Sequence, residues 1–175
     1  SSELEGMRTS KQKGFLNDDG STSLLTATAP LHYMSSKGSW ENIDLNIKAT
    51  VDGWEVTENT FKVSFPSEAG NGVEVMVNQN VDPIVTGIKP MVLMLDATGE
   101  APMPYMTAPA HEGISVGGNV IRYPLAEGFD LDYTVEEEQV KQNLVIRERP
   151  VLSEDIAWFG LTEQMRLPVG YGLYL

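Results

Sequence analysis

Ser115 is the residue of this 175-residue chain that comes closest to a catalytic motif. It lies in Gly113-Ile114-Ser115-Val116-Gly117, which matches the G-x-S-x-G pattern of a serine nucleophile. That chemistry needs a strand before the serine, a helix after it, and an acid and then a histidine later in the chain. A strand-like segment follows Ser115 instead, and both histidines, His32 and His111, precede it. The motif therefore predicts a glycine-rich turn, and a hydrolase is the least favoured function.

The sequence also has few residues that could bind zinc. The chain has two histidines and no cysteine, whereas zinc sites take three or four ligands, mostly nitrogen and sulfur. His32 lies in a strand-like segment, where we expect a buried, hydrogen-bonded histidine between sheets. His111 lies beside Glu112 in a proline-rich stretch and is expected to be exposed.

Calcium is favoured over zinc, because oxygen donors gather at two places. Asn17, Asp18 and Asp19 surround a tight turn, and Asp130 and Asp132 project from one face of a strand. Neither group fits the twelve-residue calcium loop, and asparagine and aspartate are also the residues that hairpin turns require. A calcium site and the absence of any cofactor therefore both stay open.

The other carboxylates carry no catalytic signal. Among 25 acidic residues no single pair stands out for glycoside hydrolysis. The run from Glu136 to Glu138 is read as a solvated turn, whose charge protects a hairpin from edge-to-edge association. Lys141 is expected to offset a nearby carboxylate across this hairpin.

Trp40 and Trp54 are the candidate ligand-binding residues. Each follows a turn, and an exposed pair of aromatic rings on one face would form a stacking platform for carbohydrate. The simpler interpretation is that each ring covers the edge of the core.

Strands rather than helices position all of these residues. Apolar and polar residues alternate with period 2 in the segments 43–47, 61–65, 73–77 and 129–135, and no 3.6-residue period is sustained. In 129–135 we expect the apolar residues to face inward and Asp130 and Asp132 to face solvent or a neighbouring chain. The fold class is therefore all-β, either an antiparallel β-sandwich or an irregular multi-sheet β fold. We expect one β-rich module over 1–175, with a proline-rich surface loop at 99–113.

Composition excludes several classes of function. A net charge of −13 repels phosphate backbones and disfavours nucleic acid binding, although it could attract divalent cations. The longest apolar run, 90–95, is too short to span a bilayer. The chain begins without methionine or a targeting segment, so it is interpreted as a processed piece of a larger polypeptide.

Two blocks of the sequence resemble a known kind of domain. The first runs Pro30-Leu31-His32-Tyr33 and then Gly38, Trp40, Ile43 and Asp44; the second runs Tyr123, Gly128 to Leu131, Tyr133, Val135, Lys141, Leu144 and Val145. Both resemble β-rich domains near the N-terminus of large secreted microbial surface proteins, including YD-repeat (RHS-like) wall-associated proteins and proteins that carry DNRLRE modules. The resemblance implies an extracellular β module without catalytic residues.

The favoured function is a non-catalytic structural or interaction module of a prokaryotic cell-surface or filament-like assembly. Its partners would be other protein chains or copies of itself, joined through β-strand edges. The expected interface is the C-terminal strand, where Leu173 and Leu175 share one face and Tyr174 lies on the other. A carbohydrate-binding module that uses Trp40 and Trp54 is the alternative.

Because no histidine follows Ser115, replacing it with alanine should leave any activity of the native protein unchanged. A serine-directed fluorophosphonate probe should likewise fail to label this residue. Covalent labelling of Ser115, located by peptide mass spectrometry, would show the prediction to be wrong.

Overall fold

The fold is built from strands, as the alternation predicts. The computed structural model describes residues 1–77, 80–96, 98, 103–104, 114–148 and 156–172. Within these residues there is no helix, and every pair of neighbouring strands is antiparallel. The expected all-β, multi-sheet fold is confirmed.

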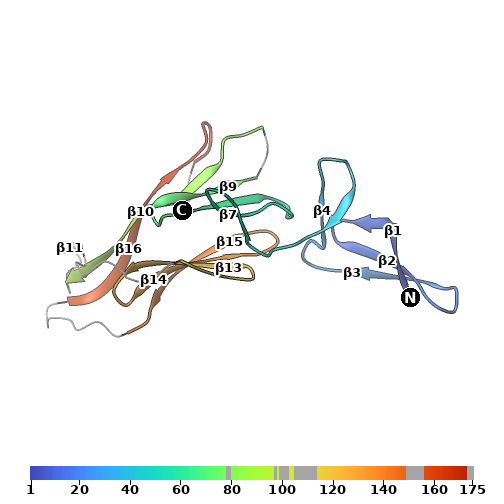
Figure 1. Cartoon of the computed structure of the whole chain (residues 1–175), viewed down its shortest axis with the longest axis horizontal. Helices are drawn as coiled ribbons and strands as arrows, with labels where there is room; N and C mark the ends of the chain where they lie inside the picture. Colours follow the sequence, from blue (N-terminus) through green and yellow to red (C-terminus); the bar gives the residue numbers. More distant parts are fainter. Residues whose placement is uncertain (78–79, 97, 99–102, 105–113, 149–155, 173–175) are drawn as a thin grey trace.

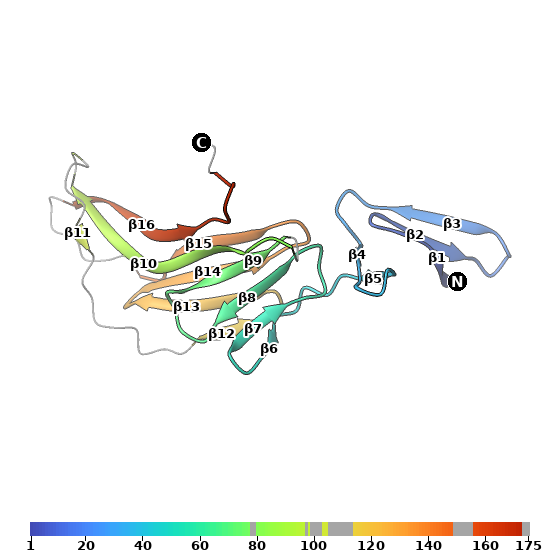
Figure 2. The same cartoon turned by 90° about the horizontal axis from the view of Figure 1, so that it is seen from above.

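The N-terminal residues 1–42 form a small lobe that we call the arm. Its strands are β1 (Ser2–Thr9), β2 (Gln12–Leu16) and β3 (Thr22–Thr26), which form a three-stranded sheet in that order, and the hairpin of β4 (His32–Met34) and β5 (Trp40–Asn42). Figures 1 and 2 show the arm at one end of the molecule, set apart from the other sheets.

The remaining residues form a two-sheet sandwich. The larger sheet contains β6 (Lys48–Ala49), β7 (Gly53–Val56), β8 (Lys62–Pro66), β9 (Asn71–Met76), β10 (Ile84–Asp96) and β11 (Met103–Pro104), and β16 (Ile156–Arg166) also pairs with β10. The smaller sheet has the order β12 (Ser115–Gly117), β13 (Val120–Ala126), β14 (Phe129–Val135) and β15 (Val140–Ile146). Figure 1 shows the two sheets as facing layers.

The core lies between the inner faces of these two sheets. Val63 and Phe65 are buried while Lys62 and Ser64 between them are exposed, as the alternation in 61–65 predicts. The smaller sheet contributes its inward residues from β13 and β14. Buried core residues are Ile47, Val56, Phe61, Val63, Phe65, Val73, Ile121, Tyr123, Leu131, Tyr133 and Val135.

The expectation that Asp130 and Asp132 face solvent is wrong. Asp130 is 1% exposed and Asp132 is 9% exposed. Arg122 of β13 lies opposite Asp132 and donates two hydrogen bonds of 2.7 Å to its carboxylate. The Nε atom of Arg147 lies 3.1 Å from Oδ2 of Asp130. These guanidinium groups supply the countercharge that buried carboxylates require, so β14 is buried on both faces.

A bend in β10 brings the two sheets together. Its register shifts between Val85 and Met91, where Gly87 has φ +69° and Lys89 has φ +48°. A Cβ atom at Gly87 would overlap with the hydroxyl oxygen of Tyr133. Gly87 is therefore required both for its backbone conformation and for the close approach of a core side chain.

Gly87→Ala should destabilise the fold more than Gly128→Ala. Both glycines have positive φ, so both substitutions incur backbone strain of about 1–2 kcal/mol, but a Cβ at Gly128 meets open space. The clash with Tyr133 should add about 1–3 kcal/mol at Gly87. Urea unfolding measures the difference, and equal losses for the two variants would contradict the packing described here.

Candidate functional site

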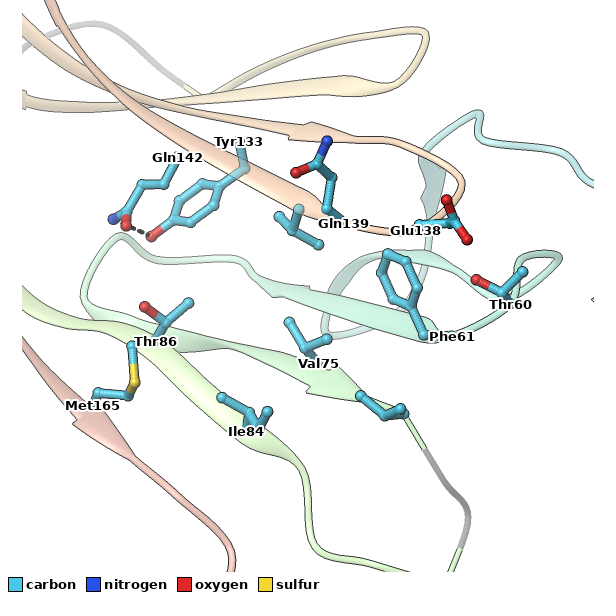
Figure 3. A pocket seen from close by; sticks show the side chains of 12 residues that line it. Thr60, Phe61, Val75, Ile84, Thr86, Tyr133, Glu138, Gln139, Gln142 and Met165 are labelled. Atoms are coloured by element: carbon cyan, nitrogen blue, oxygen red, sulfur yellow. Dashed lines mark hydrogen bonds between the residues drawn. The ribbon is translucent and has the colours of Figure 1, made fainter. Parts of the chain in front are cut away.

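An open groove lies between the two sheets of the sandwich. Its volume is about 650 Å³, and Figure 3 shows its lining side chains converging from both sheets. One wall comes from residues 60–61, from Val75 and Val77, from β10 and from Met165 of β16; the other comes from Tyr133 and the start of β15. The apolar lining residues are Phe61, Val75, Val77, Ile84, Val140 and Met165.

The groove is open because the smaller sheet ends before the larger one. β15 is the last strand of its sheet, whereas the facing sheet continues through β9 and β10 to β16. Met165 is 45% exposed, and Val77, which follows the last residue of β9, is 69% exposed, although both lie beside buried core residues. A further strand beside β15 would cover these side chains.

The backbone groups of β15 that point away from β14 can be identified from the hydrogen bonds at the two ends of the pair. Arg147 N donates to Gly128 O at 2.8 Å, and Glu136 N donates to Gln139 O at 2.9 Å. Because hydrogen-bonded pairs alternate along antiparallel strands, residues 141, 143 and 145 face β14. The N–H and C=O groups of 140, 142, 144 and 146 therefore point outward along the open edge.

A polar network closes one end of the groove. Gln142 Nε2 donates to Tyr133 Oη at 3.1 Å and to Glu163 Oε2 at 2.6 Å, and the first of these bonds is drawn in Figure 3. Thr86 Oγ1 donates to Glu163 Oε1 at 2.6 Å. These bonds join β15 to β10 and β16, so they hold the two walls at a fixed separation.

The other end of the groove leads toward the arm. A second, more polar cavity of about 340 Å³ lies between residues 33–36 of the arm and residues 57–62 of the sandwich. Thr60, Phe61 and Val77 line both cavities, so the two cavities are neighbours. Neighbouring cavities beside a strand edge suit an extended polypeptide.

The turn at Glu136 to Glu138 is part of the scaffold of the groove. Asn59 Nδ2 donates to Glu136 O at 2.9 Å and Thr60 Oγ1 donates to Glu137 O at 2.5 Å. Lys141 Nζ lies 2.5 Å from Glu136 Oε1, which confirms the predicted countercharge across the hairpin. This hydrogen bond from Lys141, followed by one from Gln139, lowers the pKa of Glu136.

Ser115 and His32 are not brought together as a catalytic pair. Ser115 is exposed at the start of β12, a turn and a strand follow it, and Gly113 and His111 lie outside the described residues. His32 is fully buried in the arm, where its protonated Nδ1 donates to Thr9 O at 2.7 Å. His32 is thus buried and hydrogen-bonded through Nδ1, as expected, whereas its buried Nε2 has no hydrogen-bond partner within the part of the chain that the structure describes.

The candidate calcium ligands already have protein partners. Asp19 accepts hydrogen bonds from Ser21 Oγ at 2.6 Å and Ser21 N at 2.9 Å, and these bonds lower the pKa of Asp19. Asp130 and Asp132 face the guanidinium groups of Arg122 and Arg147. Across the described ranges, no group of three His, Asp or Glu side chains could hold a metal ion. Calcium binding remains a prediction.

Trp40 and Trp54 lie on different sheets. Trp40 is half-buried in β5 of the arm, and Trp54 is half-buried in β7, where it packs against the sandwich core. Trp54 thus has the core-edge position that packing favours, and the two rings do not form a shared platform.

The predicted C-terminal interface, Leu173, Tyr174 and Leu175, lies outside the described residues, as does most of the proline-rich stretch 99–113. Within 99–113, Met103–Pro104 forms the short edge strand β11. A search of the described residues for a helix long and apolar enough to cross a membrane finds none.

Comparison with protein-family models, with curated proteins and with solved structures finds no match for this chain. The proposals below therefore depend on the sequence and the geometry of this chain itself.

Two buried tyrosines, Tyr123 in the core and Tyr133 beside the groove, make the fold sensitive to alkali. Burial raises the pKa of Tyr123, and burial with the nearby Glu163 carboxylate raises the pKa of Tyr133. Because the neutral form is stabilised in the folded state, this contribution is complete below the unfolded pKa of about 10 and is lost as pH rises above it.

Spectrophotometric titration at alkaline pH should therefore show that Tyr123 and Tyr133 ionise only together with unfolding. Tyr133→Phe should reduce the steepness with which the free energy of unfolding falls above pH ~10. Ionisation of both tyrosines in a chain that keeps its folded circular dichroism spectrum would contradict their burial.

Proposed function

We propose that this chain is a non-catalytic structural module of a cell-surface assembly, which joins other chains through the open edge of β15. The partners are protein chains, and copies of this chain come first among them. The observation that carries the proposal is the coincidence of outward-pointing backbone groups on β15 with the apolar groove beside it. Strand edges of this kind accept an additional strand from a partner.

An added strand would gain two kinds of interaction at once. Its backbone would hydrogen-bond the outward groups of residues 140, 142 and 144. Its inward side chains would cover Val77 and Met165, each of which is more than 40% exposed. Burial of one large aliphatic side chain contributes about 1.5–3 kcal/mol, so two or three such side chains would offset much of the cost of ordering a short strand, about 1–2 kcal/mol per residue.

The proposed extracellular location has separate support. The acidic composition and the absence of cysteine suit a soluble surface module that depends on its core rather than on disulfides. The resemblance of its two sequence blocks to secreted microbial surface domains points to the same location.

Gln142→Pro should abolish this association while Gln142→Ala largely preserves it. Both variants lose the side chain that bonds Tyr133 and Glu163, but only proline removes the outward N–H of residue 142. Sedimentation velocity of the isolated chain from micromolar to millimolar concentration gives the association constant. We expect that constant to fall at least about tenfold further for the proline variant than for the alanine variant.

Two outcomes would contradict the proposed function. One is a chain that stays monomeric at all of these concentrations. The other is association in which the proline and alanine variants have the same constant, because the edge of β15 would then take no part.

A further inference from the structure

The arm carries a second surface without a visible partner. Gly14 lies between Leu4 of β1 and Leu24 of β3 in the sheet register, and Leu16 lies on the same face two residues further along β2. The side chain of Met7 packs over Gly14. We call this surface the leucine face; it consists of Leu4, Met7, Leu16 and Leu24.

The arm's own hairpin covers the part of the other face that lies beside β1. Glu3 lies on that side, with Nε2 of His32 at 3.8 Å and Nε of Arg8 at 2.7 Å from its carboxylate. On the leucine face, by contrast, Met7, Leu16 and Leu24 are between 41% and 53% exposed. A three-stranded sheet needs a packed apolar face to be stable, and one face of this sheet is uncovered.

β3 also has an open edge, and its outward groups can be assigned. Asn17 N donates to Ser21 O at 2.8 Å and Ala27 N donates to Lys11 O at 2.9 Å at the two ends of its pairing with β2. By the same alternation, the backbone N–H and C=O groups of Ser23 and Leu25 face β2. The N–H and C=O groups of Thr22, Leu24 and Thr26 point outward.

On β3, Leu24 has an outward-pointing backbone and a side chain on the leucine face. On β15, the residues with outward-pointing backbones have their side chains on the inner face of the sandwich. Directly opposed residues of paired strands have side chains on the same side of the joined sheet. If Leu24 lies opposite residue 140, 142 or 144, the leucine face continues the inner face of β15. It then covers the groove, with its apolar side chains toward Val77 and Met165.

Net charge disfavours a contact between the sandwiches of two copies and favours a contact in which at least one surface belongs to an arm. Residues 1–42 hold four Lys and Arg and five Asp and Glu, so the arm is nearly neutral. Residues 43–175 hold eight Lys and Arg and twenty Asp and Glu. If two sandwiches met, each would bring a net charge of about −12. If an arm met a sandwich, the two net charges would be about −1 and −12, so the repulsion would be weaker.

We propose that β3 of one copy pairs with β15 of another copy, so that the leucine face of its arm covers the groove of that copy's sandwich. This inference rests on the proposed function and names its partner. The contact joins two different surfaces. It therefore propagates from copy to copy unless two copies exchange arms and close.

Cross-linking of single-cysteine variants tests the contact directly, because the chain contains no cysteine of its own. Leu24→Cys is mixed with Val77→Cys at a concentration where the chain associates, and a short bismaleimide is added. The matched control replaces Leu24→Cys with Leu25→Cys. Leu25 is 50% exposed and Leu24 is 53% exposed, but Leu25 lies on the opposite face of β3. We expect at least about tenfold more mixed dimer from the first mixture.

Lysine substitution gives the matching equilibrium measurement. Leu24→Lys should weaken self-association at least about tenfold, because an apolar contact is lost and a charge enters the groove, whereas Leu25→Lys should change it less than about threefold. Circular dichroism verifies that both variants are folded, which is expected because both leucines are half exposed.

The outcomes separate this inference from the proposed function. Equal yields from the two mixtures, or no mixed dimer from either, would overturn the arm as the occupant. If Gln142→Pro still abolishes association in that case, the proposed role of the β15 edge is retained, and a surface other than the arm binds there. If Gln142→Pro associates as well as Gln142→Ala, both proposals fall.

Discussion

The burial of β14 on both faces is the constraint on which the rest of the sandwich depends. On its inner face, Leu131 and Tyr133 fill the space between the sheets. On its outer face, Asp130 and Asp132 are buried against two arginines from the neighbouring chain segments. Truncating one partner of such a buried pair is typically much more destabilising than truncating an exposed one. Both neighbours of β14 are therefore fixed, and β15 is left as the boundary of its sheet.

That boundary explains why the molecule has a groove at all. Tyr133 reaches across to Gly87 in the bend of β10, and its hydroxyl accepts a hydrogen bond from Gln142 of β15. The larger sheet continues past this point and the smaller one does not. The apolar side chains beyond the boundary are thus half exposed in the isolated chain. A partner strand would extend the same antiparallel pairing and the same core that hold the sandwich together.

The sequence predicted the strands much better than it predicted the site. Alternation identifies the core of β8 because Lys62 and Ser64 are solvated on one side. The same rule fails for Asp130 and Asp132, because their arginine partners come from other strands and a period within one strand cannot show them. Arg122 and Arg147 lie just outside the two ends of the second sequence block, and only the pairing register places them beside these carboxylates.

Sequence patterns could not predict the groove, for a similar reason. Val73, Val75 and Val77 look equivalent in sequence, yet Val73 is buried and Val77 is 69% exposed. Val73 lies within β9 and packs in the core, whereas Val77 lies beyond Met76, the last residue of β9; the difference depends on where the strand ends rather than on local composition. The expected interface was placed at Leu173, Tyr174 and Leu175, outside the described residues. The principle behind it, that a strand edge recruits partners, applies to β15 as well.

Amide hydrogen exchange along β15, followed residue by residue by NMR in dilute and in concentrated solution, tests the central claim most directly. In the isolated chain the amides of 141 and 143 are bonded to β14, whereas those of 140, 142 and 144 point away from it. The account predicts that 141 and 143 are protected at both concentrations, and that 140, 142 and 144 gain protection only when the chains associate. Association that leaves the exchange of 140, 142 and 144 unchanged would contradict it.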